Sequence, residues 1–191
     1  MNPMEQLLDW QKEQQKQAKS EMPGLCCLST IGEDDFPNAR YVSLKEINDQ
    51  GFIMTGPLQS MKGKELLSCS KTALTFWWKE TGRQVRVQGE ATQLSPQEAD
   101  EIFVELTRDV QILCWASDQS AAIDDPEKLE EDYKKFDEQY QGMKIPRPEN
   151  WGGFMITPLQ IEFLDSPSDH LQTRELYTKV GKNWEKKYLQ P

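Results

Sequence analysis

The sequence of 191 residues has one histidine and four cysteines, and these small numbers limit the sites it can build. With His170 as the only histidine, no serine–histidine–aspartate set can be argued. No glycine motif of the nucleotide-binding kinds is present either. The cysteines lack the paired spacing of metal ligands, which favours reduced thiols over zinc or disulfides; they are Cys26, Cys27, Cys69 and Cys114.

Basic residues and long apolar runs are also scarce. The 22 lysines and arginines are outnumbered by 32 acidic residues, which gives a net charge of −10. A nucleic-acid-binding protein needs a basic face, and a membrane helix needs ~20 apolar residues in a row. A charged helix follows Met1 almost at once, so no signal peptide is expected. The chain is therefore predicted to be cytoplasmic and to bind a small molecule rather than nucleic acid, a membrane or a metal.

Hydrophobic periodicity predicts one domain, mostly β, with peripheral helices. Residues 1–20 contain an N-terminal helix, and residues 121–150 form a helix and a linker within the domain. Short links between strands favour an antiparallel barrel with helices packed outside. The predicted strands are residues 24–31, 40–47, 51–55, 73–78, 84–94, 151–156, 160–164, 176–180 and 184–189. Helices are predicted at residues 4–19, 60–68 and 125–140, after the capping box at residues 95–98, and as a short helix or turn at 111–117.

One predicted strand carries a polar face. Alternation along residues 83–89 places Gln84, Arg86 and Gln88 on one side. Because this face follows two tryptophans, it is typical of a wall that contacts a flat, anionic ligand. Other cations and amides lie near strand and helix starts, where charge-assisted bonds and free helix N–H groups hold phosphates; solvated surface charges are the alternative. They are Arg40, Lys45, Lys62, Lys64, Arg83, Gln119, Ser120 and Arg174.

Six ordered motifs resemble the pyridoxamine 5'-phosphate oxidase family. Residues 82–89 are similar to its Arg-Gln-Val-Arg strand, and residues 60–66 to its Ser-Arg-Lys-Gly helix start. The other similar segments are residues 38–45, 111–120, 146–153 and 161–163, together with the terminal residues 189–191. The resemblance implies an FMN-binding split β-barrel, usually a homodimer with FMN at the subunit interface.

The resemblance also implies a cofactor site. The strand from Arg40 to Lys45 is expected to lie along the flavin, Lys62 to hold the phosphate, and Gln84 to bond the ring system. Contacts from Gln119 and Ser120 are expected to come from the other subunit. Where the family has an arginine and a tryptophan, this chain has Met61 and Leu164, and losing one charge-assisted bond weakens binding by ~1.5–3 kcal/mol. The implied cofactor-binding set is Arg40, Tyr41, Val42, Ser43, Leu44, Lys45, Thr55, Gly56, Met61, Lys62, Gln84, Gln119, Ser120 and Arg174.

The implied substrate site departs further from the family. The lysine that grips the substrate phosphate is kept as Lys45, but its three polar partners are replaced by Ile102, Leu106 and Val110. An apolar trio cannot compensate a phosphate dianion, although ordinary helix packing also explains these residues. The residues expected to close over the substrate ring are His170 and Gln172. The family's N-terminal segment that contacts substrate is expected to be missing here.

Three functions fit this pattern. The first is an FMN-dependent oxidase that passes hydride from a small cyclic substrate to flavin and then to O₂, on a substrate less phosphorylated and more apolar than usual, as in the phenazine-biosynthesis oxidases. The second is a true pyridoxamine/pyridoxine 5'-phosphate oxidase with a rearranged phosphate site. The third is a flavin-binding protein without oxidase activity. No catalytic acid or base can be assigned; His170 is the candidate by residue type.

Overall fold

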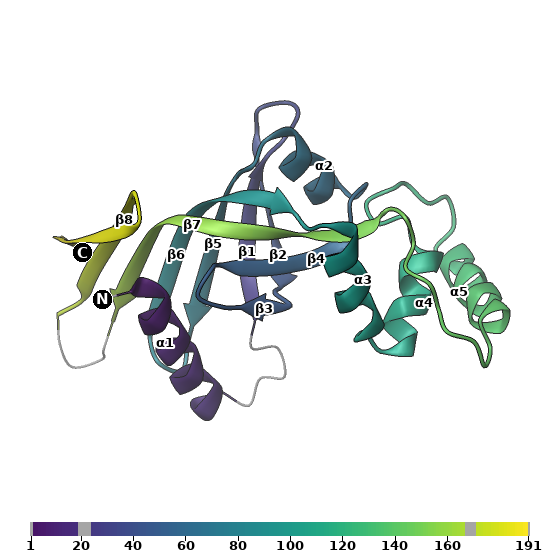
Figure 1. Ribbon diagram of the computed structural model, residues 1–191, viewed down its shortest axis with the longest axis horizontal. Helices are drawn as coiled ribbons and strands as arrows, with labels where there is room; N and C mark the ends of the chain where they lie inside the picture. Colours follow the sequence, from purple (N-terminus) through teal and green to yellow (C-terminus); the bar gives the residue numbers. More distant parts are fainter. Residues whose placement is uncertain (1, 19–23, 167–170, 191) are drawn as a thin grey trace.

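The structure is a computed structural model that describes residues 2–18, 24–166 and 171–190 (Figure 1). Its strands form one antiparallel sheet in the order β2-β1-β5-β6-β7-β4-β3, and β8 joins β7 to β9. The strands are β1 (Leu25–Ile31), β2 (Pro37–Ser43), β3 (Glu46–Ile47), β4 (Phe52–Pro57), β5 (Lys71–Trp78), β6 (Arg83–Gln93), β7 (Trp151–Asp165), β8 (Thr173–Val180) and β9 (Asn183–Leu189). The helices are α1 (Pro3–Gln17), α2 (Met61–Ser68), α3 (Pro96–Val104), α4 (Arg108–Ala116) and α5 (Glu127–Gln139). The predicted mostly β fold with peripheral helices is confirmed.

Strand β7 connects the two ends of the molecule. One edge of β7 pairs with β6 over nearly its whole length. The other edge is shared, because β4 pairs with the first residues of β7 and β8 pairs with the last ones. Figure 1 shows α4 and α5 near the start of β7 and the β8 hairpin at its far end. Residues of β4 and residues of β8 therefore lie near opposite ends of β7 within one chain.

The main hydrophobic core lies on the inner face of the sheet. Val85 and Val87 of β6 are fully buried, as the period of two predicts. Helix α1 covers this core with Met4 and Leu7, both almost completely buried. The α1 helix is thus part of the packed structure and holds one side of the sheet.

Arg83 fastens α1 to the sheet. The ring of Trp10 packs edge-on against Phe163, with 5.1 Å between ring centroids. The Arg83 guanidinium carbon lies 4.4 Å from the centroid of the Trp10 ring, and the guanidinium pairs with Glu13 of α1. Arg83 therefore packs against α1, and its candidate role in a phosphate pocket stays a prediction.

The strand predicted at residues 40–47 is divided in two. Strand β2 pairs with β1 as far as Ser43. The N–H of Leu44 then donates to the carbonyl of Gly24 (3.0 Å), whereas the N–H of Lys45 donates to the carbonyl of Ile53 in β4 (2.8 Å). The chain changes partner from β1 to β4 between two neighbouring residues, which alternation alone cannot reveal.

The two strands predicted at residues 151–156 and 160–164 are one strand. A β-bulge between Gln88 and Gly89 shifts the register, so that Gly89 pairs with Pro158 and Gln88 pairs with Gln160. The bulge lets the sheet accept a proline, which has no N–H to donate. Glycine is needed at position 89 because a Cβ there would lie 2.5 Å from the carbonyl oxygen of Thr157.

A smaller core lies among α3, α4 and α5. Phe103 of α3 packs against Trp151 with 5.1 Å between ring centroids, and Trp115 of α4 contacts the rings of Phe136 in α5 and of its C-cap Tyr140. Helix α4 begins at Arg108, three residues before the predicted start at residue 111. Its N-cap residue, Thr107, makes no side-chain capping hydrogen bond. Within the described ranges, no helix has the length and apolar character needed to cross a membrane.

Candidate functional site

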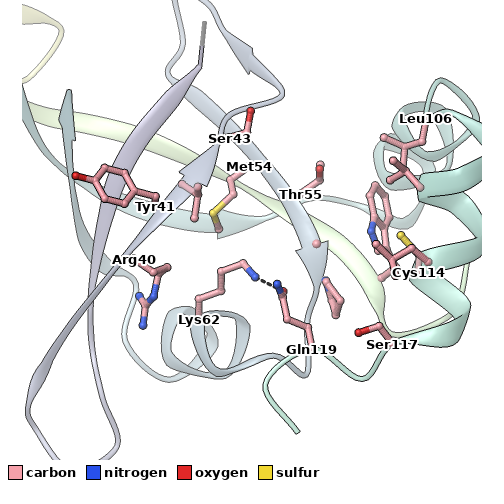
Figure 2. Close-up of a pocket in the computed structure, with 16 residues that line it drawn as sticks. Arg40, Tyr41, Ser43, Met54, Thr55, Lys62, Leu106, Cys114, Ser117 and Gln119 are labelled. Atoms are coloured by element: carbon pink, nitrogen blue, oxygen red, sulfur yellow. Dashed lines mark hydrogen bonds between the residues drawn. The ribbon is translucent and has the colours of Figure 1, made fainter. Parts of the chain in front are cut away.

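A cavity of about 410 Å³ is lined by residues of β2, β4, α2 and α4, and by segments next to them (Figure 2). It contains residues from both the predicted cofactor set and the predicted substrate set. The lining residues are Arg40, Tyr41, Val42, Ser43, Met54, Thr55, Gly56, Pro57, Lys62, Leu106, Val110, Leu113, Cys114, Ser117, Gln119 and Trp151.

The start of α2 holds Lys62 in this cavity. Ser60 is the N-cap of α2, and its hydroxyl accepts a hydrogen bond from the Gly63 N–H (3.4 Å). Lys62 Nζ donates to Ser60 Oγ (3.4 Å) and to Oε1 of Gln119 in the same chain (Figure 2). Burial, and next the charge of Arg40, lower the pKa of Lys62. A partly desolvated ammonium beside a helix start suits a phosphate group.

Arg40 also lines the cavity, but a carboxylate already pairs with it. Arg40 Nη2 lies 2.9 Å from Glu65 Oε2. Thr30 Oγ1 and Asn38 Nδ2 donate to the same carboxylate, each at 2.6 Å. These donors satisfy a carboxylate that is almost completely buried. Glu65 therefore offsets the charge of Arg40, whereas Lys62 is held by neutral groups.

The wall opposite Lys62 is apolar. In Figure 2, Leu106 and Cys114 lie across the cavity from Arg40, Tyr41 and Lys62. Burial raises the pKa of the Cys114 thiol to about 11, although a hydrogen bond involving Trp151 opposes this effect, so the thiol is neutral near pH 7. The apolar side chains of this wall are those of Leu106, Val110 and Leu113.

Lys45 lies near the cavity but is not one of its lining residues. Its Nζ forms an ion pair with Glu105 Oε2 at 2.9 Å. Glu105 is the C-cap of α3 and comes directly before Leu106, which does line the cavity. The lysine that the resemblance assigned to a substrate phosphate therefore has a carboxylate partner from its own chain.

Gln84 and Arg174 lie at the other end of β7. Leu164 pairs with Gln84 of β6 on one side and with Arg174 of β8 on the other. Gly56, in the cavity, pairs with Gly152 near the start of β7. The twelve steps from Gly152 to Leu164 correspond to roughly 40 Å of strand, at about 3.3 Å per residue. One chain therefore holds two separate groups of predicted cofactor-binding residues.

Other predicted residues lie beside the cavity instead of in its lining. Met61 and Ser120 line a neighbouring hollow on the outer side of α2. Leu44 is buried in the main core, and Ile102 packs against the smaller core. Ordinary helix packing, the alternative explanation offered by the sequence, is therefore what the structure shows for Ile102.

Of the two residues predicted to close over the substrate ring, only Gln172 belongs to the described part of the chain, and it does not line the cavity. Gln172 is exposed just before β8, at the same end of the chain as Arg174. His170 lies outside the described residues, and its role as an acid or base stays a prediction.

Sequence reasoning missed several lining residues on α4 and β7. Cys114 of α4 and its C-cap Ser117 follow the predicted Val110 at steps of four and three, so helical periodicity could have placed them on the same face. For Trp151 the sequence offers no comparable signal, because its position in the cavity depends on pairing between β4 and β7.

Comparison with known proteins agrees with this architecture. Residues 12–140 match the family described as Pyridoxamine 5'-phosphate oxidase, and residues 151–191 match the Pyridoxine 5'-phosphate oxidase C-terminal dimerisation region. Over 190 residues the chain is 36% identical to a pyridoxine/pyridoxamine 5'-phosphate oxidase of Cyanothece sp., covering 100% of this chain and 89% of that relative. The corresponding values for a relative from Acaryochloris marina, which has the same name, are 37%, 100% and 86%.

Solved structures show the same fold. PhzG from Burkholderia lata, in complex with tetrahydrophenazine-1-carboxylic acid, matches with a TM-score of 0.92 and 28% identity, covering 100% of this chain and 93% of that one. A pyridoxamine 5'-phosphate oxidase-related, FMN-binding protein from Nostoc punctiforme matches in fold with a TM-score of 0.79, 14% identity and coverage of 100% and 99%.

The fold and these matches define the class: a family of flavin-type oxidoreductases with a split β-barrel. The chain belongs to the pyridoxamine 5'-phosphate oxidase family, as the motifs predicted, and it carries the family's dimerisation region.

Proposed function

We propose that the chain binds FMN in the cavity, with the phosphate at Lys62 and the ring system along β2 and β4. The donor chemistry supports this placement, since Lys62 and the start of α2 offer a cation and free N–H groups. Gly56 supports it too. With φ at 155° it adopts a conformation that favours glycine, and a Cβ there would lie 3.6 Å from Lys62 Nζ, so glycine leaves space beside the ammonium.

A second copy of the chain completes this proposed site. Gln84 and Arg174 are too far along β7 to contact a cofactor held at Lys62 of the same chain. Tyr41 lines the cavity and is 77% exposed, so the cavity opens at the protein surface. The matched dimerisation region supports a homodimer in which each site combines the cavity of one copy with the Gln84–Arg174 row of the other. The cytoplasmic location stays a prediction.

The proposed reaction is the oxidation of a small cyclic substrate that is not a phosphate ester. Bound FMN would supply the redox chemistry, taking hydride from a substrate C–H and passing the electrons to O₂ to give peroxide. The chain binds and orients the cofactor and provides the apolar wall. That wall carries the proposal, because a phosphate dianion against Leu106 and Val110 would lose several kcal/mol of solvation. The phosphate-free ligand named for PhzG supports the same substrate class.

A true pyridoxine/pyridoxamine 5'-phosphate oxidase is the second candidate. The relatives that bear this name are 36–37% identical over the whole chain, which is the observation in its favour. A flavin-binding protein without oxidase activity is the third, and activity measurements separate it from the other two.

Titration with FMN tests the cofactor site. Absorbance and fluorescence of the purified protein should change at micromolar FMN. Lys62→Ala should raise the Kd about 10- to 100-fold, because a charge-assisted bond contributes about 1.5–3 kcal/mol. Lys64→Ala, an exposed lysine of the same helix, is the matched control and should leave the Kd nearly unchanged. No spectral change with the unaltered protein at tens of micromolar FMN would contradict the proposal.

Substrate oxidation tests the activity. FMN-loaded protein is incubated in air with tetrahydrophenazine-1-carboxylic acid or with pyridoxamine 5'-phosphate, and peroxide is measured. We expect peroxide with the ring carboxylic acid and little with the phosphate ester. Turnover of pyridoxamine 5'-phosphate at about 1 per second or faster would support the second candidate instead. Peroxide from neither compound, together with slow reoxidation of chemically reduced protein, would support the third.

A further inference from the structure

Lys45 and Glu105 form an ion pair at the edge of the cavity. Lys45 follows the end of β2 and is 31% exposed, and Glu105 is 63% exposed at the end of α3. Because Leu106 comes directly after Glu105 and lines the cavity, the pair lies where a substrate in the cavity would meet Lys45.

The arginines on the same side of the cavity are also engaged. Between residues 95 and 150 the sequence has two arginines, Arg108 and Arg147. Arg108 pairs with Asp137 of α5 (2.8 Å) and donates to two backbone carbonyls. Arg147 pairs with Asp100 (2.6 Å) and donates to the backbone carbonyl of Trp151. Both arginines near α3 and α4 are therefore already paired with a carboxylate when an anionic substrate group enters there.

We infer that Glu105 disfavours anionic substrates, by occupying Lys45 in the position that a substrate anion would otherwise take. The site then favours a ring with less negative charge than a phosphate ester. This inference deepens the proposed function and rests on its placement of the substrate in the cavity. An exposed ion pair is weak, so Glu105 lowers the affinity for an anion by only about two- to fivefold, and the apolar wall supplies further discrimination.

The test compares one ligand with and without its phosphate. The probes are 4-deoxypyridoxine 5'-phosphate and 4-deoxypyridoxine, whose 4-methyl group lacks the alcohol or amine that the named relatives' substrates carry. Their Kd values are measured by calorimetry for the unaltered protein, for Glu105→Gln and for Glu101→Gln. Glu101→Gln is the matched control, because it removes the same charge from the same helix, and the Glu101 carboxylate accepts from Gln97 at 3.0 Å.

We expect Glu105→Gln to bind 4-deoxypyridoxine 5'-phosphate about two- to fivefold more tightly, with no gain for 4-deoxypyridoxine. Glu101→Gln should bind both probes as the unaltered protein does. The inference is overturned if Glu105→Gln shows no gain for the phosphate, if both probes gain equally, or if Glu101→Gln gains as much.

The titrations are done with and without FMN, so that the inference and the proposed function can fail separately. Failure to bind FMN contradicts the proposed function, and the response of Lys45 to the phosphate is still read in the FMN-free protein. Binding of FMN without a phosphate-specific gain in Glu105→Gln contradicts only the role of Glu105.

Discussion

Carboxylates neutralise two of the three cations that the sequence points to around the cavity. Glu65 of α2 pairs with Arg40, and Glu105 at the end of α3 pairs with Lys45. Lys62 instead contacts a hydroxyl and an amide, which can orient an ammonium without cancelling its charge. The cavity thus has one positive end and an apolar wall facing it, which suits a ligand with one anionic end and an apolar body.

Binding of FMN should weaken with rising pH because of Lys62. Burial and the nearby Arg40 lower the pKa of Lys62, so its ammonium is lost at a lower pH than that of an exposed lysine. Only the ammonium pairs with the phosphate; therefore affinity is greatest below the lowered pKa and falls as pH rises through it. The FMN Kd, measured from neutral pH to about pH 9.5, should rise for the unaltered protein but much less for Lys62→Arg, because a guanidinium stays protonated. Parallel curves for both proteins would contradict this assignment.

Removal of Glu65 should destabilise the fold. Glu65→Ala leaves Arg40, Thr30 and Asn38 without their shared acceptor in a buried position, and breaking a buried pair in this way costs about 3–5 kcal/mol. Urea unfolding should show this loss in the free energy of unfolding. Glu33→Ala, at an exposed turn, should change it by less than about 0.5 kcal/mol. A small effect of Glu65→Ala would mean that the network does not hold α2 to the sheet.

The cavity residues differ in how far the sequence could predict them. Lys62 and Gln119 lie in ordered motifs, and the structure brings them into contact although 57 positions separate them. Gln119 reaches Lys62 from the same chain, whereas the resemblance led us to expect its contacts to come from the other subunit. The carboxylates at positions 65 and 105 carried no signal, because the fold and not local spacing brings them to their partners Arg40 and Lys45.

At the scale of elements, local signals gave correct elements and long-range pairing gave the errors. The capping box at Ser95 and Glu98 marks the start of α3, and both of its reciprocal bonds are present. The two predicted halves of β7 are one strand, because a bulge at Leu159, opposite the Gln88–Gly89 step of β6, accommodates Pro158 within the pairing. A chain that switches partners, as at Leu44 and Lys45, likewise has no signature in a single segment.

The contact between α1 and β6 gives a prediction at the element scale. Arg83→Gln removes the cation over Trp10 and the pair with Glu13, and should lower the free energy of unfolding by about 1–2 kcal/mol. The FMN Kd should not change, since Arg83 contacts α1 and not the cavity. Thermal unfolding and FMN titration measure both effects, with Lys79→Gln in the adjoining turn as the exposed control. Weaker FMN binding with unaltered stability would restore Arg83 to the ligand site.

At the scale of the whole molecule, the described chain holds the predicted cofactor-binding residues in two separate groups. The cavity lies beside β4, and the row of Gln84, Leu164 and Arg174 lies where β7 meets β8. A large apolar side chain is exposed beside this row, with Trp77 60% exposed on β5 next to Gln84. Such exposure is typical of a surface that another chain covers. Under the proposed function, a complete FMN site would then need the cavity of one copy of the chain and the row of a second copy.

Subunit mixing tests this arrangement directly. Lys62→Ala damages the cavity, Arg174→Ala damages the row, and each homodimer should bind FMN weakly. In a heterodimer of the two variants, one site carries both substitutions and the other carries neither, provided that each site takes its cavity and its row from different copies. Heterodimers purified through two different affinity tags should therefore bind one FMN per dimer with the affinity of the unaltered protein. If cavity and row of one chain served the same cofactor, every site would keep one substitution, and titration would find no tight site at all.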